Sequence, residues 1–242
     1  MATLIVDIET HAPKWGELPG ITRGALTQWI DKTDLTETER NKKLAVVRSR
    51  LALSPFTASI VSLGVYDVER KTGAVYFVSD TPGESFTLDS FTFKQRTESE
   101  ILEDFWEGAT SYDAFVTFNG RSFVLPFLYH RSVVTNVVPS VQIARQRYVT
   151  KQTFPYHVDL LDELSFYGAM AHRPSLQLLS GAYGIPNQSL LAGDEIAEAF
   201  TEKRFRYIAE KNAADVQVIT DLYEKWKQYF APASFITSIE NL

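Results

Sequence analysis

The hydrophobic and polar positions near the start of the chain predict a buried strand with two acidic residues on one face. In residues 3–9, TLIVDIE, successive side chains would point to opposite sides of a sheet. One side is aliphatic, and the other carries Ile5, Asp7 and Glu9. Adjacent carboxylates repel each other, and burial increases that cost. The pattern indicates either that a divalent cation offsets the repulsion, or that the strand ends near Val6 and leaves both acids at a solvent-exposed edge.

Helical and alternating patterns further along the chain predict a sheet flanked by helices. Two strands joined at 69–72 precede a helix that a capping box at Thr97 and Glu100 opens. The order of strands and helices is typical of an α/β fold with a mixed sheet. The expected strands are 57–68, 73–79 and 113–119, and the expected helices are 97–109, 121–133 with Pro126 in its first turn, 174–184 with Pro174 at its start and Gly184 past its end, and about 201–229.

Residues 11–56 separate the first two predicted strands and have the character of an insertion. Thr36 and Glu39 form a second capping box there and open a helix within 36–53. Gly and Pro are too scattered to mark a linker, and 242 residues fall within the size of one large domain. We therefore expect a single domain over 1–242, with an insertion at about 11–56.

The long C-terminal helix contains an acidic residue on its apolar side. A stripe at spacings of three and four runs from Phe205 to Tyr229 and should face the sheet. Asp215 lies in the middle of this stripe, and a carboxylate that faces a core needs a partner. Two partners fit. One is an ion pair with Lys211, one turn earlier, and the other is a metal held together with Asp7 and Glu9.

Composition excludes several kinds of chemistry. The chain has no cysteine, which excludes disulfides and thiolate metal sites, and its four histidines lack the spacing of a zinc site. No run of 18 apolar residues and no basic-then-apolar N-terminus occurs, so we expect neither a membrane span nor a secretory signal. The lack of cysteine fits a reducing cytoplasm, where we expect the protein.

The net charge of −6 and the pI near 5.3 argue against extensive wrapping by duplex DNA. A protein that holds only a strand end needs no more than a local basic patch, and the aromatic residues Tyr148, Phe154 and Tyr156 could stack on unpaired bases or belong to the core. Two groups of basic residues could form a patch or be ordinary solvated charges: Arg121, Arg131, Arg145, Arg147 and Lys151, and Lys203, Arg204, Arg206 and Lys211.

Four segments carry a resemblance to a known family. The stretches VDIET, FVTFNGRSFVLPFL, YHVDLLDEL and NAADV resemble the DEDD superfamily of 3′–5′ exonucleases, and in particular the proofreading domain of family B DNA polymerases. The resemblance implies a ribonuclease H-like fold and a site in which acidic residues hold two divalent metals, Mg²⁺ or Mn²⁺. Asp7, Glu9 and Asp215 match catalytic and metal-binding positions. The resemblance further implies substrate contacts from Ile8, Thr10, Asn119, Phe123 and Lys211.

Two positions depart from the pattern of that superfamily. Val124 stands where the second motif has an Asp, and valine cannot bind a metal. The third motif has Tyr four residues, or His five residues, before its Asp, but Lys211 and Glu210 occupy those places before Asp215, and Tyr207 is too far round the helix to substitute. Loss of one metal-organising group costs on the order of 10³-fold in rate. The sequence therefore predicts a very slow or inactive nuclease.

Some residues could restore part of the site. Asp159 and Asp162 could lend a carboxylate, or they could cap a helix and carry surface charge. Lys211 could act as a base or hold a phosphate, or it could pair with Asp215 and take the charge role of a metal. Three hypotheses remain: a weakened or inactive exonuclease that still binds 3′ ends, single-stranded DNA rather than RNA, or a partner protein; an active metal-dependent exonuclease with a rearranged site; and an interaction module that does not bind nucleic acid.

Overall fold

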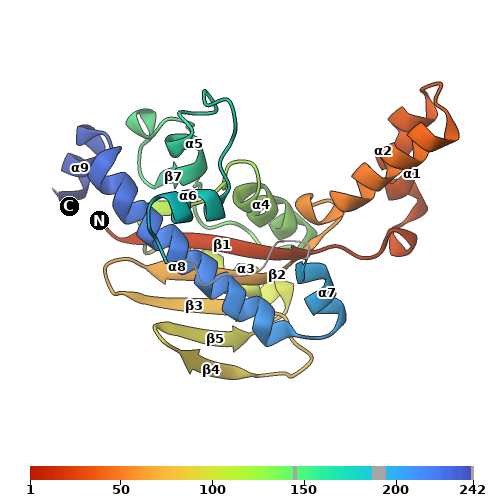
Figure 1. Cartoon of the computed structure of the whole chain (residues 1–242). Coiled ribbons are helices and arrows are strands. Elements are labelled where there is room, and N and C mark those ends of the chain that lie inside the picture. The colour runs from red at the N-terminus through yellow and green to blue at the C-terminus, as the bar shows by residue number, and fades with distance from the viewer. Residues whose placement is uncertain (144–145, 187–194, 241–242) are drawn as a thin grey trace.

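The computed structural model describes residues 1–143, 146–186 and 195–240, and within them a mixed sheet of seven strands carries helices on both faces (Figure 1). The strand order is β4-β5-β3-β2-β1-β6-β7. β1 pairs antiparallel with β2 and parallel with β6, and β7 continues the parallel part. The strands are β1 Thr3–His11, β2 Ser59–Asp67, β3 Thr72–Phe77, β4 Ser85–Leu88, β5 Phe91–Gln95, β6 Ala114–Thr117 and β7 Tyr156–Asp159.

This arrangement confirms the α/β fold with a mixed sheet and is consistent with a ribonuclease H-like exonuclease fold. The strands predicted at 57–68, 73–79 and 113–119 are present as β2, β3 and β6, and the first two form the expected antiparallel hairpin. The pair β4 and β5 was not predicted. Both strands are short and lie at the far edge of the sheet, where β4 is largely exposed and its pattern of apolar residues is weak.

β1 continues as far as His11 and pairs with β2 from Leu4 to His11, so the alternative in which the strand ends near Val6 is wrong. Its side chains alternate as predicted. Ile5 joins the apolar cluster under the C-terminal helix, and Val6 and Ile8 join the cluster on the opposite face. Asp7 and Glu9 therefore share a face with Ile5, in the part of β1 that pairs with β2 and lies beyond the ladder with β6.

The two faces of the sheet are covered by different helices. α3 (Glu98–Ala109) and α4 (Val124–Thr135) pack on the Val6 side, where the capping box of α3 and Pro126 in the first turn of α4 are confirmed. α5 (Leu160–Leu164), α6 (Leu176–Ala182) and α8 (Phe205–Tyr229) pack on the Ile5 side. α6 begins one residue after its N-cap Ser175, and Gly184 follows it with φ +67°.

The long helix ends at Tyr229 as predicted, but its start and the last position of its apolar stripe differ from the prediction. α8 begins at Phe205 rather than near residue 201, because Lys203 has a left-handed backbone (φ 60°) that separates α8 from α7 (Glu195–Thr201). Its stripe faces the sheet from Ile208 to Trp226. Tyr229 is 68% exposed, since the helix extends past the sheet before it ends.

The segment between β1 and β2 contains a pair of helices that projects from the end of β1 (Figure 1). α2 (Glu37–Ser49) opens with the predicted capping box, whereas α1 (Gly20–Asp31) was not predicted. Ile30 is the one buried residue of α1, which explains the weak apolar pattern. The remaining elements are the 3-10 turns Trp15–Glu17, Leu51–Leu53 and Val149–Lys151 and the helix α9 (Ala233–Glu240). No helix in the described ranges has the length and apolar character needed to cross a bilayer.

Candidate active site

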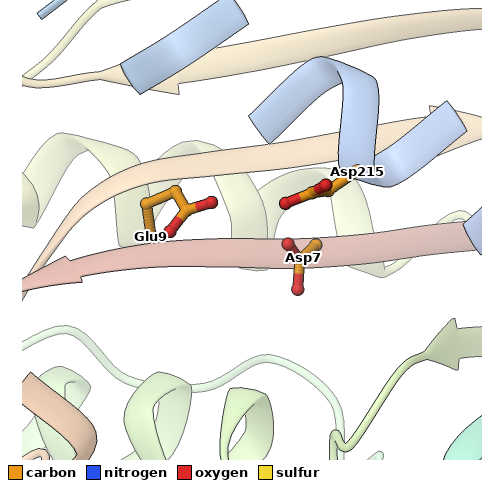
Figure 2. Close-up of side chains that lie close together, drawn as sticks. All are labelled: Asp7, Glu9 and Asp215. Carbon is orange, nitrogen blue, oxygen red and sulfur yellow. The ribbon is translucent and has the colours of Figure 1, made fainter. Parts of the chain in front are cut away.

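Three acidic side chains meet between β1 and α8. Asp7 and Glu9 come from β1 and Asp215 comes from α8, and each offers a carboxylate oxygen within 4.8 Å of the other two (Figure 2). They are the only such group of three among the described residues. The two predicted sources of acidic side chains, the strand and the apolar stripe of the helix, are thus brought to one place.

Small residues on β2 allow α8 to come this close. Gly64 is the cross-strand partner of Asp7, and a Cβ there would lie 2.8 Å from Val216 Cγ2 and 2.9 Å from Asn212 Oδ1. Ser62 is the partner of Glu9, and its hydroxyl donates a hydrogen bond to Asn212 Oδ1 at 2.9 Å. A larger side chain at residue 64 would force the helix away from the sheet, so this glycine sets the height of α8 above the acids.

Asn212 links the helix directly to β1. Its amide Nδ2 donates to Asp7 Oδ2 at 3.3 Å while its Oδ1 accepts from Ser62, and its side chain is fully buried. The stripe of α8 already included Asn212, but sequence reasoning gave it no role. A buried amide on a core-facing stripe, one turn before an unexplained acid, is the signal that could have identified it.

Lys211 places its ammonium between two of the three carboxylates. Its Nζ lies 2.6 Å from Glu9 Oε1 and 2.6 Å from Asp215 Oδ2. The side chains of Lys211, Glu9 and Asp215 are only 8%, 11% and 14% exposed. Of the roles considered for Lys211, the ion pair with Asp215 is present. A second bond from the same ammonium, to Glu9, connects α8 to β1.

The electrostatics follow from this crowding. Burial raises the pKa of Asp7 well above its usual value, and the charges of Glu9 and Asp215 raise it further. Burial also raises the pKa of Glu9 to about 7, although the Lys211 ammonium opposes the shift. Burial lowers the pKa of Lys211, but the two carboxylates more than offset this, so the pKa of the ammonium is above its ordinary value. Lys211 therefore keeps its positive charge beside Glu9, whose pKa burial has raised.

The donor set suits a divalent metal, but the arrangement does not. Three carboxylate oxygens within 4.8 Å are ligands of the kind that Mg²⁺ and Mn²⁺ prefer. A metal bound to Glu9 and Asp215 would have to displace an ammonium that lies 2.6 Å from both. With Lys211 in this position, the residues do not fit a resident metal ion.

The other predicted site residues do not belong to this cluster. Asn119 has a left-handed backbone (φ 61°) just after β6, and Phe123 precedes α4 and packs on Phe127. Ile8 faces the opposite core, and the hydroxyl of Thr10 donates to Ala52 O at 2.7 Å. Within the described residues, neither side chain has a hydrogen bond to the three acids.

Val124 is completely buried among the apolar residues on the Val6 side. It supplies packing and no metal ligand. Asp159 caps α5 and also accepts hydrogen bonds from the backbone N–H groups of Asn119 at 3.0 Å and Arg121 at 2.9 Å. Asp162, three residues later, pairs with Arg121, Arg147 and Arg173. Neither aspartate belongs to the three-acid group. The capping alternative is correct for Asp159, whereas the surface-charge alternative is wrong for Asp162, which is buried.

Some members of the two expected groups of basic residues are engaged elsewhere. Arg131 forms a largely buried ion pair with Glu98 at 2.7 Å, and Lys211 belongs to the acidic cluster. Lys203 and Arg204 precede α8 rather than lying on it. Arg145 lies outside the described residues. Of the three aromatic residues, Tyr148 and Phe154 are exposed, and Tyr156 packs on Phe235.

Comparison with known proteins agrees with this architecture. Residues 68–230 match the model of a family described as a predicted 3′–5′ exonuclease related to the exonuclease domain of PolB. The match includes β6, α4, β7 and α8, and it begins after β1. Comparison with curated proteins gave no significant match. Because the matched segment covers well over half of the chain, the protein belongs to this family of predicted 3′–5′ exonucleases related to the exonuclease domain of PolB.

Proposed function

We propose that this protein has the exonuclease fold with little or no nuclease activity and that it binds 3′ ends of nucleic acid. The observation that carries the proposal is the position of Lys211 Nζ, 2.6 Å from both Glu9 and Asp215. The lysine replaces the group expected to orient water and places a cation where the family expectation puts a metal. Val124 stands where the family expectation puts a fourth acidic residue, so that carboxylate is absent.

A tethered ammonium competes strongly with a free ion. Lys211 is held by the backbone of α8 one turn before Asp215, so its effective concentration at the carboxylates does not depend on solution conditions. The ammonium carries one charge where a divalent ion carries two, and it cannot ionise a bound water as a metal does. The arrangement thus preserves the fold around the acids and removes the means to activate a nucleophile.

The substrate class follows from the family and remains part of the proposal. A site near the carboxyl ends of parallel strands, with Asn119 and Phe123 following β6 in the chain, suits a terminal nucleotide. We propose single-stranded DNA in preference to RNA as the ligand, with a partner protein as the alternative ligand. We also propose a single domain over 1–242 in which 11–56 is an insertion.

The test is a nuclease assay on a labelled single-stranded oligonucleotide with a free 3′ end and Mn²⁺. Lys211→Tyr should gain Mn²⁺ binding, measured by electron paramagnetic resonance, and Lys211→Tyr combined with Val124→Asp should trim the strand. The unmodified protein should do neither, and Asp7→Ala serves as the control for contaminating nuclease. Because Val124 is fully buried, the folded fraction of the double variant is measured by circular dichroism first.

A second candidate function is an active exonuclease with a rearranged metal site, and the three carboxylates within 4.8 Å favour it. It requires a metal to displace Lys211. Trimming by the unmodified protein that is lost in Asp7→Ala would establish this second function and overturn the first. Absence of salt-dependent oligonucleotide binding would instead indicate an interaction module without a nucleic-acid ligand.

A further inference from the structure

Three arginines converge on one carboxylate near the end of β7. Asp162 lies 3.6 Å from a guanidinium nitrogen of each of Arg121, Arg147 and Arg173. The Asp162 side chain is 10% exposed, whereas Arg147 and Arg173 are each 47% exposed. Three cations therefore share a single buried anion and present their outer surfaces to solvent.

The three arginines have no second ionic partner within the described residues. Arg173 has Asp162 as its only ionic partner there, and neither Arg121 nor Arg147 has another. The neighbouring Asp159 is occupied by backbone N–H groups. Asp159 and Glu163 are further acidic groups nearby, but neither forms an ion pair with these arginines in the described part of the chain, so three guanidiniums share one directly paired carboxylate in a protein whose net charge is −6. Such a concentration of arginine is an electrostatic feature suited to phosphate.

Aromatic rings adjoin these arginines. Tyr148 is 43% exposed and packs edge-on against Tyr167, with ring centroids 4.7 Å apart. Arg147 lies over the Tyr167 ring at 5.8 Å, and Lys151 lies over the Tyr148 ring at 5.6 Å. We call these residues the basic–aromatic surface: Arg121, Arg147, Tyr148, Lys151, Tyr167 and Arg173.

The backbone under this surface is held in an uncommon conformation. Phe166 and Tyr167 are consecutive non-glycine residues with left-handed φ angles of 52° and 57°. The Tyr167 hydroxyl donates to Glu163, and its backbone N–H donates to Asp162 O at 2.6 Å. Strain of this kind is retained where the surrounding contacts impose it, and it is frequent at ligand-binding sites. Here it fixes the Tyr167 ring against Tyr148 and Arg147.

The basic–aromatic surface lies at the same edge of the sheet as the acidic cluster. β1, β6 and β7 run parallel, and Ile5 is level with Val116 and hence with Val158. Asp7 and Glu9 lie beyond Ile5 at the carboxyl end of this parallel part, and Arg121 and Asp162 lie just beyond the ends of β6 and β7. A strand whose 3′ end approached Asp7 would have this surface beside it.

We propose that the basic–aromatic surface binds the phosphates and unpaired bases of a single-stranded nucleic acid whose 3′ end lies at the acidic cluster. The inference rests on the proposed function and names the surface that would hold the strand. Guanidiniums donate paired hydrogen bonds to phosphate oxygens, and an exposed tyrosine next to basic groups offers a stacking platform that tolerates any base.

The experiment measures fluorescence anisotropy of a 5′-fluorescein-labelled dT12 strand, in EDTA and over a range of salt concentrations. Arg147→Gln with Arg173→Gln should weaken binding about tenfold or more and reduce the slope of log affinity against log salt by about 0.7 per arginine. Tyr148→Ala should weaken binding and leave the slope unchanged. Asp162→Asn should strengthen binding, because it removes the anion among the guanidiniums.

Arg206→Gln is the matched control. Its guanidinium lies 3.7 Å from Glu84 and 4.0 Å over the Phe86 ring, so it has the same kinds of contact with a similar exposure. The Arg206→Gln variant should bind dT12 with the same affinity, and the same slope of log affinity against log salt, as the unmodified protein. All variants are checked by circular dichroism, and the half-exposed positions of Arg147 and Arg173 make loss of folding an unexpected result.

The outcomes separate the two proposals. If the unmodified protein binds dT12 and the arginine and Tyr148 variants bind as Arg206→Gln does, the basic–aromatic surface is not the binding surface, and the proposed function stands. If the unmodified protein fails to bind dT12 at every salt concentration tested, the proposal of nucleic-acid binding itself is wrong. Weaker binding by Asp162→Asn, with its folding intact, would also overturn the inference.

Discussion

Replacement of Lys211 by methionine isolates the effect of the buried ammonium. Methionine keeps a long flexible stem and removes the charge. Glu9 and Asp215, whose side chains are 11% and 14% exposed, would then face Asp7 with no cation between them. Removal of one partner from a buried ion pair costs about 3–5 kcal/mol of unfolding free energy, because the remaining charge is left uncompensated. We expect a loss of this size at pH 8.

The loss should depend on pH and on metal. Burial already raises the pKa of Glu9 to about 7, and without the ammonium nothing opposes that shift. At pH 6 the acids take up protons and recover part of the lost stability. Mn²⁺ should stabilise Lys211→Met and leave the unmodified protein unchanged, by about 2.7 kcal/mol when its concentration is 100 times the dissociation constant.

The assay is urea unfolding followed by circular dichroism, at pH 6 and pH 8, with EDTA or with Mn²⁺. Lys227→Met is the control on the same helix, since Lys227 pairs with Glu224 at 2.9 Å on the surface and should lose at most about 1 kcal/mol. A Lys211→Met protein that is as stable as Lys227→Met at pH 8 would refute the reasoning. So would Lys211→Met that shows no response to Mn²⁺.

Three further results are expected. Burial raises the pKa of Glu9 in the folded protein from 4.5 to about 7, so the stability that its protonated form contributes is present below pH 4.5 and lost as pH rises to 7. Glu9→Gln should remove about 2–3 kcal/mol of that pH dependence, measured by urea unfolding of both proteins over this pH range. Gly120→Ala would place a Cβ 1.9 Å from Thr117 Oγ1, and calorimetry should show a loss of about 1–3 kcal/mol. Ser62→Ala leaves the Asn212 carbonyl without its buried donor and should cost about 1–3 kcal/mol by urea unfolding, while Ser62→Thr retains the hydroxyl.

The parts of this fold that the sequence predicted are those with strong local signals. The alternation in β1 and the capping box at Thr97 each lie within a few residues, and both are present in the structure. The stripe on α8 correctly placed Asp215 on the side that faces the sheet. Elements with weak local patterns, such as α1 and β4, were missed because few of their side chains are buried.

The contacts that define the site are of another kind. Lys211 and Glu9 are 202 residues apart, and their bond at 2.6 Å depends on the height of α8 above the sheet. That height depends on Gly64, which is opposite Asp7 only because of the register between β1 and β2. Sequence reasoning predicted the partner of Lys211 on the same helix, at a spacing of four residues, and could not predict the partner on the strand.

The contact with Glu9 changes what the three acids signify. In a sequence, Asp7, Glu9 and Asp215 point to catalysis because adjacent buried carboxylates otherwise have no physical reason to be together. Here the ammonium of Lys211 supplies such a reason, since it bonds acids from both β1 and α8 and so connects the strand to the helix. Loss of Glu9 or Asp215 would therefore expose a buried lysine charge, and either change would weaken the fold even in a protein with no nuclease activity. Damage from substituting these acids is thus no evidence of catalysis unless folding is measured in the same variants.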